Sequence, residues 1–532
     1  MAPNGKKATP KFDVAKGHRD WYGANAILRN HIRGTLGTVF ERYGYQPIET
    51  PLVEDQAAIG FKGGGEIQKE VYTLSDNGKR DLALRFDQTV PLARFMATHL
   101  GEISLPFKRY AIGPVFRDGP TQPDQGRYRS FTQCDVDVLG LPSMAAEAEL
   151  LALAQDAFST LGLGGVEASV NNRKLLDGIL ECAGVPDGSK LRTIVTLDKL
   201  DKMEGKLPEL KETLTKLTLA DGDVMISQET LDKLFDLYDN KTPEIALSRC
   251  HSAIVEEVGQ VGYAAIEEVF KQNAGRTATY ADVSSFKTKG DLLLEPAMVN
   301  RLMEIVSAEG SNDDIFRYLS QKIASDRGQE GLREIGEVLG YSKSMGIDFV
   351  RFNPALARGL DYYTGTTLEV FLKNREIVNS AILAGGRFDN MVGDFCGGEE
   401  IPAVGFSFGL ERLAMVLAGQ NSNLPSTTVQ VYLVPTEGAD VGDILASAHK
   451  LRQQGLNVDS QILPLSNRQR KRIVGNVADA GIPYIGFVSP QGVEAGTVGV
   501  KNLSTRDQND VPVGEVAKYI ASENCKDLVS PP

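Results

Sequence analysis

Cysteine and histidine are scarce in this chain of 532 residues, which contains five of each. The cysteines are widely spaced and never form a CxxC pair, and the histidines show no spacing typical of metal ligands. This pattern argues against a disulfide framework and against a zinc site, and it favours free thiols in a reducing compartment. We therefore expect a cytoplasmic protein with no metal ion bound by its own side chains.

Long apolar runs and an excess of positive charge are also missing. No stretch approaches the roughly 20 apolar residues that a membrane-spanning helix needs, and the N-terminus, MAPNGKKATPKF, has no apolar core of a secretory signal. The formal net charge is −13, which argues against nonspecific coating of nucleic acid, although a local basic surface is enough to contact phosphates. We expect no membrane partner, and the charge leaves nucleic-acid binding open.

The remaining composition is that of an ordinary globular protein, with 42% apolar and 24% charged residues, and the length suits about three or four domains. Residues 1–15 are interpreted as a disordered tail. Strand and helix signals occupy 16–173 and return at 346–420. Between them, 174–345 is dominated by charged helical patterns such as LDKLDKMEGKLPELKETLTKL, which indicate a helical insertion. Residues 427–520 alternate strand and helix, which predicts a parallel sheet covered by helices.

Hydrophobic periodicity places individual elements within these parts. Apolar residues at three- and four-residue spacing predict a helix within 16–45, and an Ala-rich stretch predicts another over 144–161. A strand that runs into a helix is expected over 403–419. Alternating or continuous apolar patterns predict strands at 80–86, 106–118, 136–140, 166–172, 347–352 and 366–372.

Two strands joined by a polar loop are expected over 110–140. Arg117 ends the first strand, and Arg127 and Arg129 lie where the loop returns. The alternate positions of the second strand, which share one face, hold Gln133, Asp135 and Asp137. This face, beside the apex of arginines, could hold a zwitterion next to a phosphate, because the planar fork of arginine matches carboxylate and phosphate oxygens. A solvated hairpin with surface ion pairs is the alternative.

The tract ARGLDYYTGTTLEVF, residues 357–371, combines charge with aromatic hydroxyls. Arg358 stands close to Asp361 and to Tyr362 and Tyr363, and a strand follows. Tyrosine can bind a polar ring through its hydroxyl while it buries apolar area. Ordinary core packing of the two tyrosines is the alternative.

Glycine-rich segments precede the last helix of this part. AGGRFDN (384–390) is followed by GFSFGLERL (405–413), and glycines let backbone approach a ligand closely. The strand-to-helix turn places Arg412 at a plausible phosphate site. Glu411 and Arg412 could instead form a pair on the helix surface.

An acidic residue and a hydroxyl are close together in LRFDQTVPLARF (84–95). We expect Asp87 and Thr89 to alternate on one strand face, where they could accept a protonated amine. A capping role for Thr89 ahead of a helix is the alternative.

Together and in this order, these segments resemble the class II aminoacyl-tRNA synthetases, specifically the histidyl-tRNA synthetase family. YGYQPIETPLVED resembles motif 1, which supports a dimer interface, FRDGPTQPDQGRYRSFTQ resembles motif 2, and GFSFGLERL resembles motif 3. LARGLDYYTG resembles the histidine-specific signature. The resemblance covers most of the chain outside the tail and 174–345. It implies a homodimeric α/β protein whose α+β catalytic domain, built on an antiparallel sheet, is interrupted by a helical insertion and followed by a parallel α/β anticodon-binding domain.

The resemblance also implies a reaction. The carboxylate of L-histidine attacks ATP to give histidyl-adenylate and pyrophosphate, and the terminal ribose of tRNA(His) then takes the histidyl group and AMP leaves. The alternative is a catalytically silent relative, either an ATP phosphoribosyltransferase regulatory subunit or a tRNA sensor. Against this alternative, Arg117, Arg358 and Arg412 are all present and the anticodon-type segment is retained.

The resemblance assigns the ATP site to four arginines. Arg117 would contact the α-phosphate and the histidine carboxylate, and Arg412 would bind the γ-phosphate. Arg358 would stabilise charge at the α-phosphate during attack, which makes Arg358 and Arg117 the expected catalytic residues. Arg127 completes the ATP-binding set, and Mg²⁺ is expected with the ATP phosphates.

Histidine itself would be bound by six residues on this resemblance. The α-amino group would be held by Asp87, Thr89 and Gln133. Asp137 and Tyr363 would bind the two imidazole nitrogens beside Tyr362, and such a site rejects analogues that lack them. Phe388 departs from the family, which usually has tyrosine at this place in a GGRYD pattern, so one hydroxyl is missing.

The only dense basic cluster of the C-terminal part would contact tRNA phosphates. A solvated helix start is the alternative. The cluster consists of Arg468, Arg470, Lys471 and Arg472.

Overall fold

The structure is a computed structural model that describes residues 12–61, 70–197, 294, 296–357, 362–398, 400–420, 426–463, 465 and 467–527. It divides into two compact units, one spanning Thr35–Met415 and one formed by Met1–Gly34 with Val416–Pro532. Most of the expected tail, the middle of the expected insertion at 198–293, and Arg358 lie outside the described residues.

The unit Thr35–Met415 is built on an eight-stranded sheet. Its six inner strands pair antiparallel, whereas the two edge strands β1 and β8 run parallel to their neighbours. The antiparallel catalytic sheet expected from the sequence is therefore confirmed. In order, the strands are β1 (Gln46–Pro47), β5 (Phe107–Phe116), β6 (Ser130–Leu139), β11 (Ala403–Gly409), β10 (Leu383–Arg387), β9 (Thr366–Leu372), β7 (Val166–Asn172) and β8 (Val350–Phe352).

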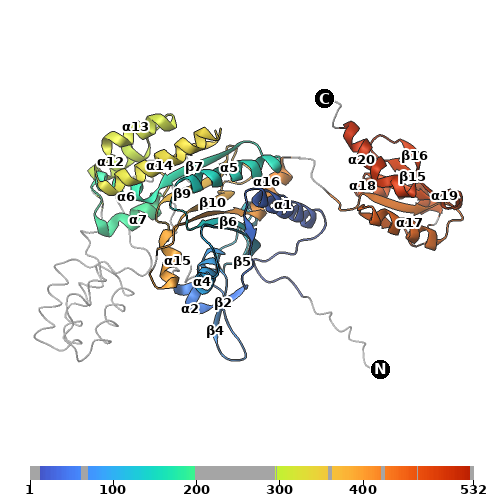
Figure 1. The fold of residues 1–532 in the computed structure, drawn as a ribbon, viewed down its shortest axis with the longest axis horizontal. Helices are drawn as coiled ribbons and strands as arrows, with labels where there is room; N and C mark the ends of the chain where they lie inside the picture. The colour runs from blue at the N-terminus through green and yellow to red at the C-terminus, as the bar shows by residue number, and fades with distance from the viewer. Residues whose placement is uncertain are drawn as a thin grey trace, which may run out of the picture. The chain divides into compact units, whose positions relative to one another are not determined.

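Helices with apolar faces cover this sheet. The Ala- and Leu-rich helix α5 (Ala145–Thr160) packs on β11, and α14 (Asp326–Ser344) packs on α5, β7 and β9 (Figure 1). α14 also lies close against α6 (Arg173–Ala183), because a Cβ on Gly178 would come 2.6 Å from the Cα of Gly328. Glycine at both positions thus lets the two backbones meet.

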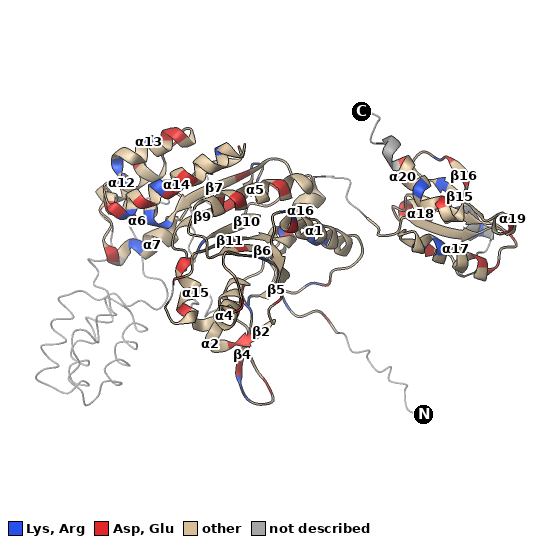
Figure 2. Cartoon of the chain, in the orientation of Figure 1, with Lys and Arg blue, Asp and Glu red and all other residues tan. Residues whose placement is uncertain are grey.

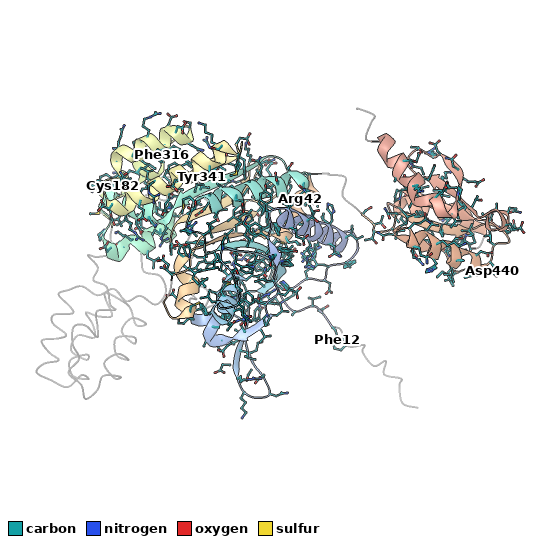
Figure 3. All side chains as sticks on the ribbon, viewed as in Figure 1. Phe12, Arg42, Cys182, Phe316, Tyr341 and Asp440 are labelled. Atoms are coloured by element: carbon teal, nitrogen blue, oxygen red, sulfur yellow. The ribbon has the colours of Figure 1, made fainter. Side chains whose placement is uncertain are left out.

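The described ends of the range 174–345 belong to this helical layer. α12 (Pro296–Val306) packs on α6, and α13 (Asn312–Lys322) packs on α14 and β8. Cys182 of α6, Phe316 of α13 and Tyr341 of α14 mark the layer in Figure 3. Its helices carry charges of both signs (Figure 2). The limits proposed for a helical insertion stay a prediction.

A smaller sheet lies beside the large one in the chain's first part. It has the order β2 (Val53–Asp55), β4 (Asp81–Leu84), β3 (Thr73–Ser75). α2 (Gln56–Phe61) packs on β4, and α4 (Thr89–His99) packs on α15 (Asp389–Cys396). Arg94 of α4 fastens this part with two hydrogen bonds of 3.0 and 2.6 Å to Glu54 of β2.

Two helices have residues in both units. α1 (Gly23–Arg42) begins later and ends earlier than the range 16–45, and it buries Ile32, Leu36, Val39 and Phe40 as the spacing predicted. α16 (Leu410–Gly419) follows β11 directly, so the expected strand-to-helix turn is confirmed. Among the described residues, no helix has both the length and the apolar character to span a membrane.

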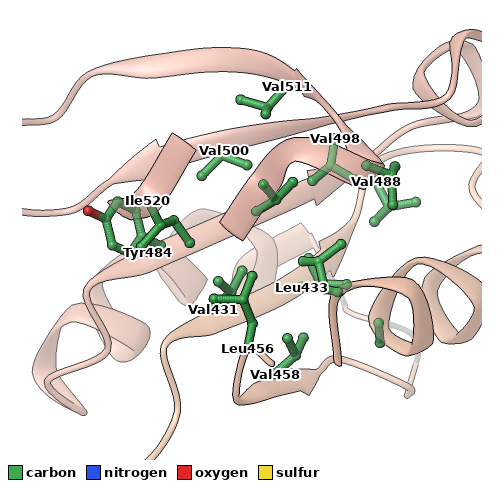
Figure 4. Packing of buried hydrophobic residues seen from close by; sticks show 14 of the residues in the cluster. Val431, Leu433, Leu456, Val458, Tyr484, Val488, Val498, Val500, Val511 and Ile520 are labelled. Carbon is green, nitrogen blue, oxygen red and sulfur yellow. The ribbon is translucent and has the colours of Figure 1, made fainter. Parts of the chain in front are cut away.

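The C-terminal part has its own five-stranded sheet and apolar core (Figure 4). Strands β13 (Val458–Ser460), β12 (Val431–Pro435) and β14 (Tyr484–Val488) are parallel, as expected. β15 (Thr497–Asn502) and β16 (Gln508–Pro512) extend the sheet antiparallel, so it is mixed rather than wholly parallel. Its helices are α17 (Val441–Gln453), α18 (Asn467–Asp479), α19 (Pro490–Ala495) and α20 (Val516–Asp527).

Candidate active site

One cavity of about 660 Å³ lies in the unit Thr35–Met415. The structure brings together at this cavity every described residue that the sequence assigned to ATP or to histidine. Arg358, the remaining residue assigned to ATP, lies outside the described residues. The lining includes Asp87, Thr89, Arg117, Arg127, Gln133, Asp137, Tyr362, Tyr363 and Arg412.

The polar face of β6 forms part of the cavity wall. Gln133, Asp135 and Asp137 all line it, as their alternation predicted. Among the described residues of this face, Gln133 Oε1, Asp135 Oδ1 and Asp137 Oδ2 are buried without a hydrogen-bond partner, although Asp137 Oδ2 lies 2.6 Å from Arg109 Nη2 as an ion pair. Buried polar atoms are nearly always hydrogen-bonded in folded proteins, so these atoms indicate a place for a polar ligand. From the sequence, Asp135 was expected on this polar face but was not assigned to a particular group of the ligand.

The two aspartates of β6 have unusual proton affinities. Burial raises the pKa of Asp135 to about 7 and that of Asp137 to about 6, while the positive charge of Arg109 acts in the opposite direction on both. Arg109 forms an ion pair of 2.6 Å with Asp137. Arg109 was not among the site residues predicted from the sequence, where its only signal is a charge within a predicted strand. Its place opposite Asp137 depends on strand register.

Asp87 has a different environment from the one predicted. It follows β4 rather than lying on it, and Thr89 is the first residue of α4. Asp87 Oδ1 accepts hydrogen bonds from the backbone N–H groups of Thr89, at 3.1 Å, and Val90, at 3.0 Å. The expected strand face is therefore wrong, and the residue whose side chain caps α4 is Asp87, not Thr89, because a carboxylate satisfies the free N–H groups of a helix start. Both side chains still reach the cavity.

Arg117 directly follows the end of β5 and packs against two aromatic rings. Its guanidinium lies 4.1 Å from the ring centre of Phe86 and 5.2 Å from that of Phe131, and its Nε donates to Phe86 O at 3.3 Å. Stacking on rings fixes the plane of an arginine without neutralising its charge. The arrangement suits a cation that must meet an anionic ligand.

The other two arginines lie where the polar loop meets α16. Arg412 Nη1 donates to Ala381 O at 2.7 Å, and Arg127 lies 3.6 Å from a carboxylate oxygen of Glu70. Gly126, with φ +69°, brings the loop so close that a Cβ there would stand 3.1 Å from Arg412 Cγ. The loop and the helix start therefore place Arg127 and Arg412 at the same end of the cavity.

Glu411 is not part of a surface pair. It is 2% exposed, and both of its carboxylate oxygens accept from the backbone N–H of Thr132 at 3.0 Å. The alternative of a helix-surface pair with Arg412 is excluded by this burial. Glu411 instead fastens the helix that carries Arg412 to the strand that carries Gln133.

The two tyrosines pack edge to face with ring centres 5.0 Å apart. Burial raises the pKa of Tyr362, so this hydroxyl keeps its proton and can donate. Gly386 of β10 makes room for the second ring, because a Cβ there would lie 2.8 Å from Tyr363 Cδ1. The glycines of the tract 384–390 therefore serve close packing of a cavity wall.

Arg387 of the same tract is part of the framework. It is 2% exposed and donates to both carboxylate oxygens of Glu147 on α5, at 2.7 and 2.8 Å. It also donates to Asp389 Oδ1 at 3.1 Å. These bonds join β10, α5 and α15, so the arginine holds the wall of the cavity instead of facing a ligand.

Comparisons with known proteins agree with this geometry. A family model described as histidyl-tRNA synthetase matches residues 17–239 and 228–413, and a model described as an anticodon binding domain matches 430–523. The chain belongs to the histidyl-tRNA synthetase family.

Individual relatives of the family match almost the whole chain. Histidine–tRNA ligase 1 of Bacillus cereus is 33% identical over 510 residues, which are 95% of this chain and 98% of that protein. The crystal structure of histidyl-tRNA synthetase from Nostoc sp. PCC 7120 has 26% identity and a TM-score of 0.71, and the match covers 97% of this chain and all of that one. A Bacillus halodurans structure titled as an ATP phosphoribosyltransferase regulatory subunit/histidyl-tRNA synthetase has 18% identity and a TM-score of 0.58 over 91% and 99% of the two chains, which shows the fold alone.

Phe388, where the family usually has tyrosine, lines the cavity and is 2% exposed. Its ring packs edge to face on Tyr362 with centres 6.3 Å apart. The departure therefore replaces a hydroxyl with an apolar contact inside the site, next to the tyrosine pair.

The basic cluster of the C-terminal part falls at the start of α18. Arg468 and Arg472 are exposed there, whereas the side chains of Arg470 and Lys471 lie outside the described part of the structure. Exposure of two cations is compatible both with phosphate binding and with a solvated helix start.

The cysteines of the described part of the chain form no disulfide: Cys134, Cys182 and Cys396 are thiols, whereas Cys250 and the side chain of Cys525 are not described. In the part of the chain that the structure describes, no group of three or more His, Cys, Asp or Glu side chains is arranged to hold a metal ion.

Proposed function

We propose that the chain joins L-histidine to tRNA(His) at the expense of ATP, through a histidyl-adenylate, with release of pyrophosphate and AMP. One observation carries the proposal. One and the same cavity is lined by three arginines, Arg117, Arg127 and Arg412, and by the buried acceptors of β6 with two tyrosines. A triphosphate and a small zwitterion with a polar ring have the charges that these two sets of groups complement.

In the proposed first step, cations stabilise the charge that develops as the histidine carboxylate attacks the α-phosphate of ATP. Arg117 contacts that phosphate and the carboxylate, and Arg358 is assigned the same role from its place in the family signature. Arg127 and Arg412 bind the remaining phosphates. The nucleophile belongs to the substrate, so no side chain of the chain forms a covalent intermediate.

Recognition of histidine is assigned to the acidic, amide and tyrosine side chains of the lining. Asp87, Thr89 and Gln133 bind the α-amino group, for which the unpaired Gln133 Oε1 is a suitable acceptor. Asp137 and Tyr363 bind the two ring nitrogens, and Tyr362 supports Tyr363 by edge-to-face packing. A site whose buried polar groups need these partners disfavours amino acids of similar size that lack them.

Mg²⁺ is proposed to arrive with the ATP phosphates. The carboxylates of Glu70 and Glu369 line the same cavity, and oxygen ligands are those that Mg²⁺ prefers. These side chains fit the ion as partial ligands, with the phosphates supplying the rest. The ion would neutralise charge on the leaving pyrophosphate.

The C-terminal part, 427–520, is proposed to bind the anticodon arm of tRNA(His) through Arg468, Arg470, Lys471 and Arg472.

We further propose a cytoplasmic homodimer with a catalytic domain at 16–173 and 346–420 and a helical insertion at 174–345. Val53 of β2 and Leu74 of β3 leave 40% and 37% of their surfaces exposed, which supports a partner on the smaller sheet. Sedimentation of the full chain would test the dimer.

Histidine-dependent exchange between ATP and pyrophosphate tests the main proposal. We expect exchange with histidine and with none of the other amino acids, and aminoacylation when tRNA(His) is added. Asp137→Asn and Tyr363→Phe should raise KM for histidine and leave KM for ATP unchanged, whereas Tyr341→Phe on α14 should change neither. A folded wild-type protein that binds tRNA but supports no exchange would favour the sensor, the second candidate.

A further inference from the structure

Arg109 occupies an unusual place for a charged side chain. It lies on the inner strand β5 and is fully buried, with a relative exposure of 0%. Its cross-strand partner in the β5–β6 register is Asp137, the residue proposed to read the imidazole. Arg109 Nη2 lies 2.6 Å from Asp137 Oδ2, and side-chain exposure is 1% for the arginine and 5% for the aspartate. The backbone register thus fixes a buried ion pair at the wall of the cavity.

The strand on the other side of Asp137 restrains its second oxygen. Gly405 of β11 is in register with Asp137, and a Cβ at Gly405 would collide with Asp137 Oδ1. The carboxylate is therefore held by a cation from β5 and fits into space that only glycine leaves on β11. Asp137 Oδ2 faces Arg109, and Asp137 Oδ1 lies beside Gly405. Both Asp137 and Gly405 line the cavity.

Arg109 also touches the segment that carries the proposed amino-group ligand. Its Nη2 lies 3.5 Å from Gln88 O, and Gln88 Nε2 donates to Gln133 O at 3.1 Å. Asp87 precedes Gln88, and Gln133 lies on β6 with Asp137. The Arg109 guanidinium therefore contacts Asp137, which is proposed to bind the imidazole. Through Gln88 it is also linked to Asp87 and Gln133, which are proposed to bind the α-amino group.

Several acidic side chains lie near the Arg109 guanidinium. Burial raises the pKa of Asp137, the charge of Asp87 raises it further, and Arg109 lowers it. The pKa of Asp135 is raised by burial and by Asp137, and Arg109 lowers it too. The described titratable groups that act on the pKa of Asp137 are Arg109 of β5 and Asp87 before α4. Asp137 in turn raises the pKa of Asp135 of β6 and of Tyr45 ahead of β1.

We propose that Arg109 is a positioning residue for histidine: it keeps Asp137 a carboxylate and aims it at a ring N–H of the substrate. The inference rests on the proposed function, because it assumes that Asp137 reads the imidazole. Arg109 does not itself touch the substrate. An ionised carboxylate only accepts hydrogen bonds and binds an N–H more strongly than a neutral carboxyl group does, so the arginine tunes specificity through the residue it pairs with.

Substitution of Arg109 in the full-length protein gives the test. In Arg109→Gln we expect KM for histidine in ATP–pyrophosphate exchange to rise on the order of tenfold to a hundredfold, with KM for ATP within about twofold of wild type. The acid limb of kcat/KM for histidine should move up by about one pH unit or more, because loss of the cation favours protonation of Asp137. The ionisable groups of the substrates titrate in the same way with both proteins, so they do not contribute to the difference between the two pH profiles.

Three further variants make the result decisive. Lys108→Gln, the neighbouring position on β5, removes an ion pair with Glu149 that faces away from Asp137, and it should leave both KM values unchanged. Asp137→Asn should raise KM for histidine, and Arg109→Gln added to it should have little further effect, because coupled residues are not additive. Arg109→Lys keeps the charge and should restore most of the pH profile.

The outcomes separate the two proposals. Absence of exchange in folded wild-type protein overturns the proposed function. An active wild type in which Arg109→Gln raises KM for ATP and for histidine equally, or moves neither KM nor the pH profile, overturns the role of Arg109 alone. Should Arg109→Gln fail to fold, Arg109→Lys decides, because lysine keeps the charge but lacks the planar fork that aims the carboxylate. A rise confined to the histidine KM, with a pH profile near that of wild type, supports the role. An equal rise of both KM values, or no rise in the histidine KM, overturns it.

Discussion

The backbone N–H of Thr132 donates to both carboxylate oxygens of Glu411, at 3.0 Å each, across 279 residues of sequence. This contact joins β6, which carries the acceptors proposed to bind histidine, to α16, which carries Arg412. The two elements, which both line the cavity, are therefore held relative to each other by a buried carboxylate. Loss of such a bond leaves a buried donor unsatisfied, which is why its effect can be measured.

Glu411→Met removes the acceptor at similar size. It is expected to lower the free energy of unfolding by about 1–3 kcal/mol and to raise KM for ATP, because the start of α16 and Arg412 lose their anchor. Chemical denaturation and exchange kinetics measure the two effects. Glu337→Met, in an exposed ion pair on α14, is the control and should change little. An unchanged KM for ATP together with lower stability would show that the contact does not position Arg412.

Gly405→Ala tests the space beside Asp137. The added methyl group would collide with Asp137 Oδ1, so we expect KM for histidine to rise about tenfold or more, which corresponds to roughly 1.4 kcal/mol or more. The matched control is Gly340→Ala on α14, where an added Cβ meets nothing within 4 Å. Equal histidine KM in both variants would mean that the carboxylate has room to move.

Arg387→Met breaks the buried pair with Glu147 and leaves a carboxylate without its cation. Removal of one partner of a buried pair costs about 3–5 kcal/mol, so a large fall in unfolding free energy is expected. Arg333→Met, at an exposed pair of the i, i+4 type, should cost about 0.5 kcal/mol or less. Similar losses for both variants would contradict a framework role for Arg387.

The pH dependence of stability follows from the aspartates of β6. Burial raises their folded-state pKa values to about 7 for Asp135 and about 6 for Asp137, above the unfolded value of about 3.9. Between these limits the folded state binds more protons, so the free energy of unfolding should fall as pH rises from about 4 to about 7. Asp135→Asn should flatten this slope in urea denaturation at several pH values, whereas the exposed Glu102→Gln should not. If the slope of Asp135→Asn equalled that of wild type, the raised pKa of Asp135 would not be a cause of the pH dependence.

The basic cluster of α18 gives a test that is independent of the cavity. Arg468→Gln with Arg472→Gln should raise KM for tRNA and weaken the salt dependence of tRNA binding, with unchanged ATP–pyrophosphate exchange. Lys450→Gln, an exposed lysine of α17, serves as the comparison. Aminoacylation equal to wild type at physiological salt would favour a solvated helix start over a phosphate contact.

Much of the fold could be predicted from local pattern. The spacing of apolar residues in α1, the alternation along β5 and β6, and the turn from β11 into α16 are properties of short stretches, and periodicity reports them. The antiparallel end of the C-terminal sheet was not predicted, because β15 and β16 add to its edge by pairing that short-range signals do not specify. Asp87 was placed on a strand for a similar reason. The local pattern of Asp87 and Thr89 fits alternation on a strand, but it also fits an acidic residue just before the start of a helix.

By itself, the sequence determined the order of the motifs, the resemblance to the family, and which residue types could meet a phosphate or an imidazole. Only the tertiary structure decided which of these residues share a cavity, that Glu411 is buried against Thr132, and that Arg109 lies opposite Asp137. The physical reason is that strand register and burial are collective. A charge becomes a partner, or a pKa shifts, only when residues far apart in the chain are packed together away from water.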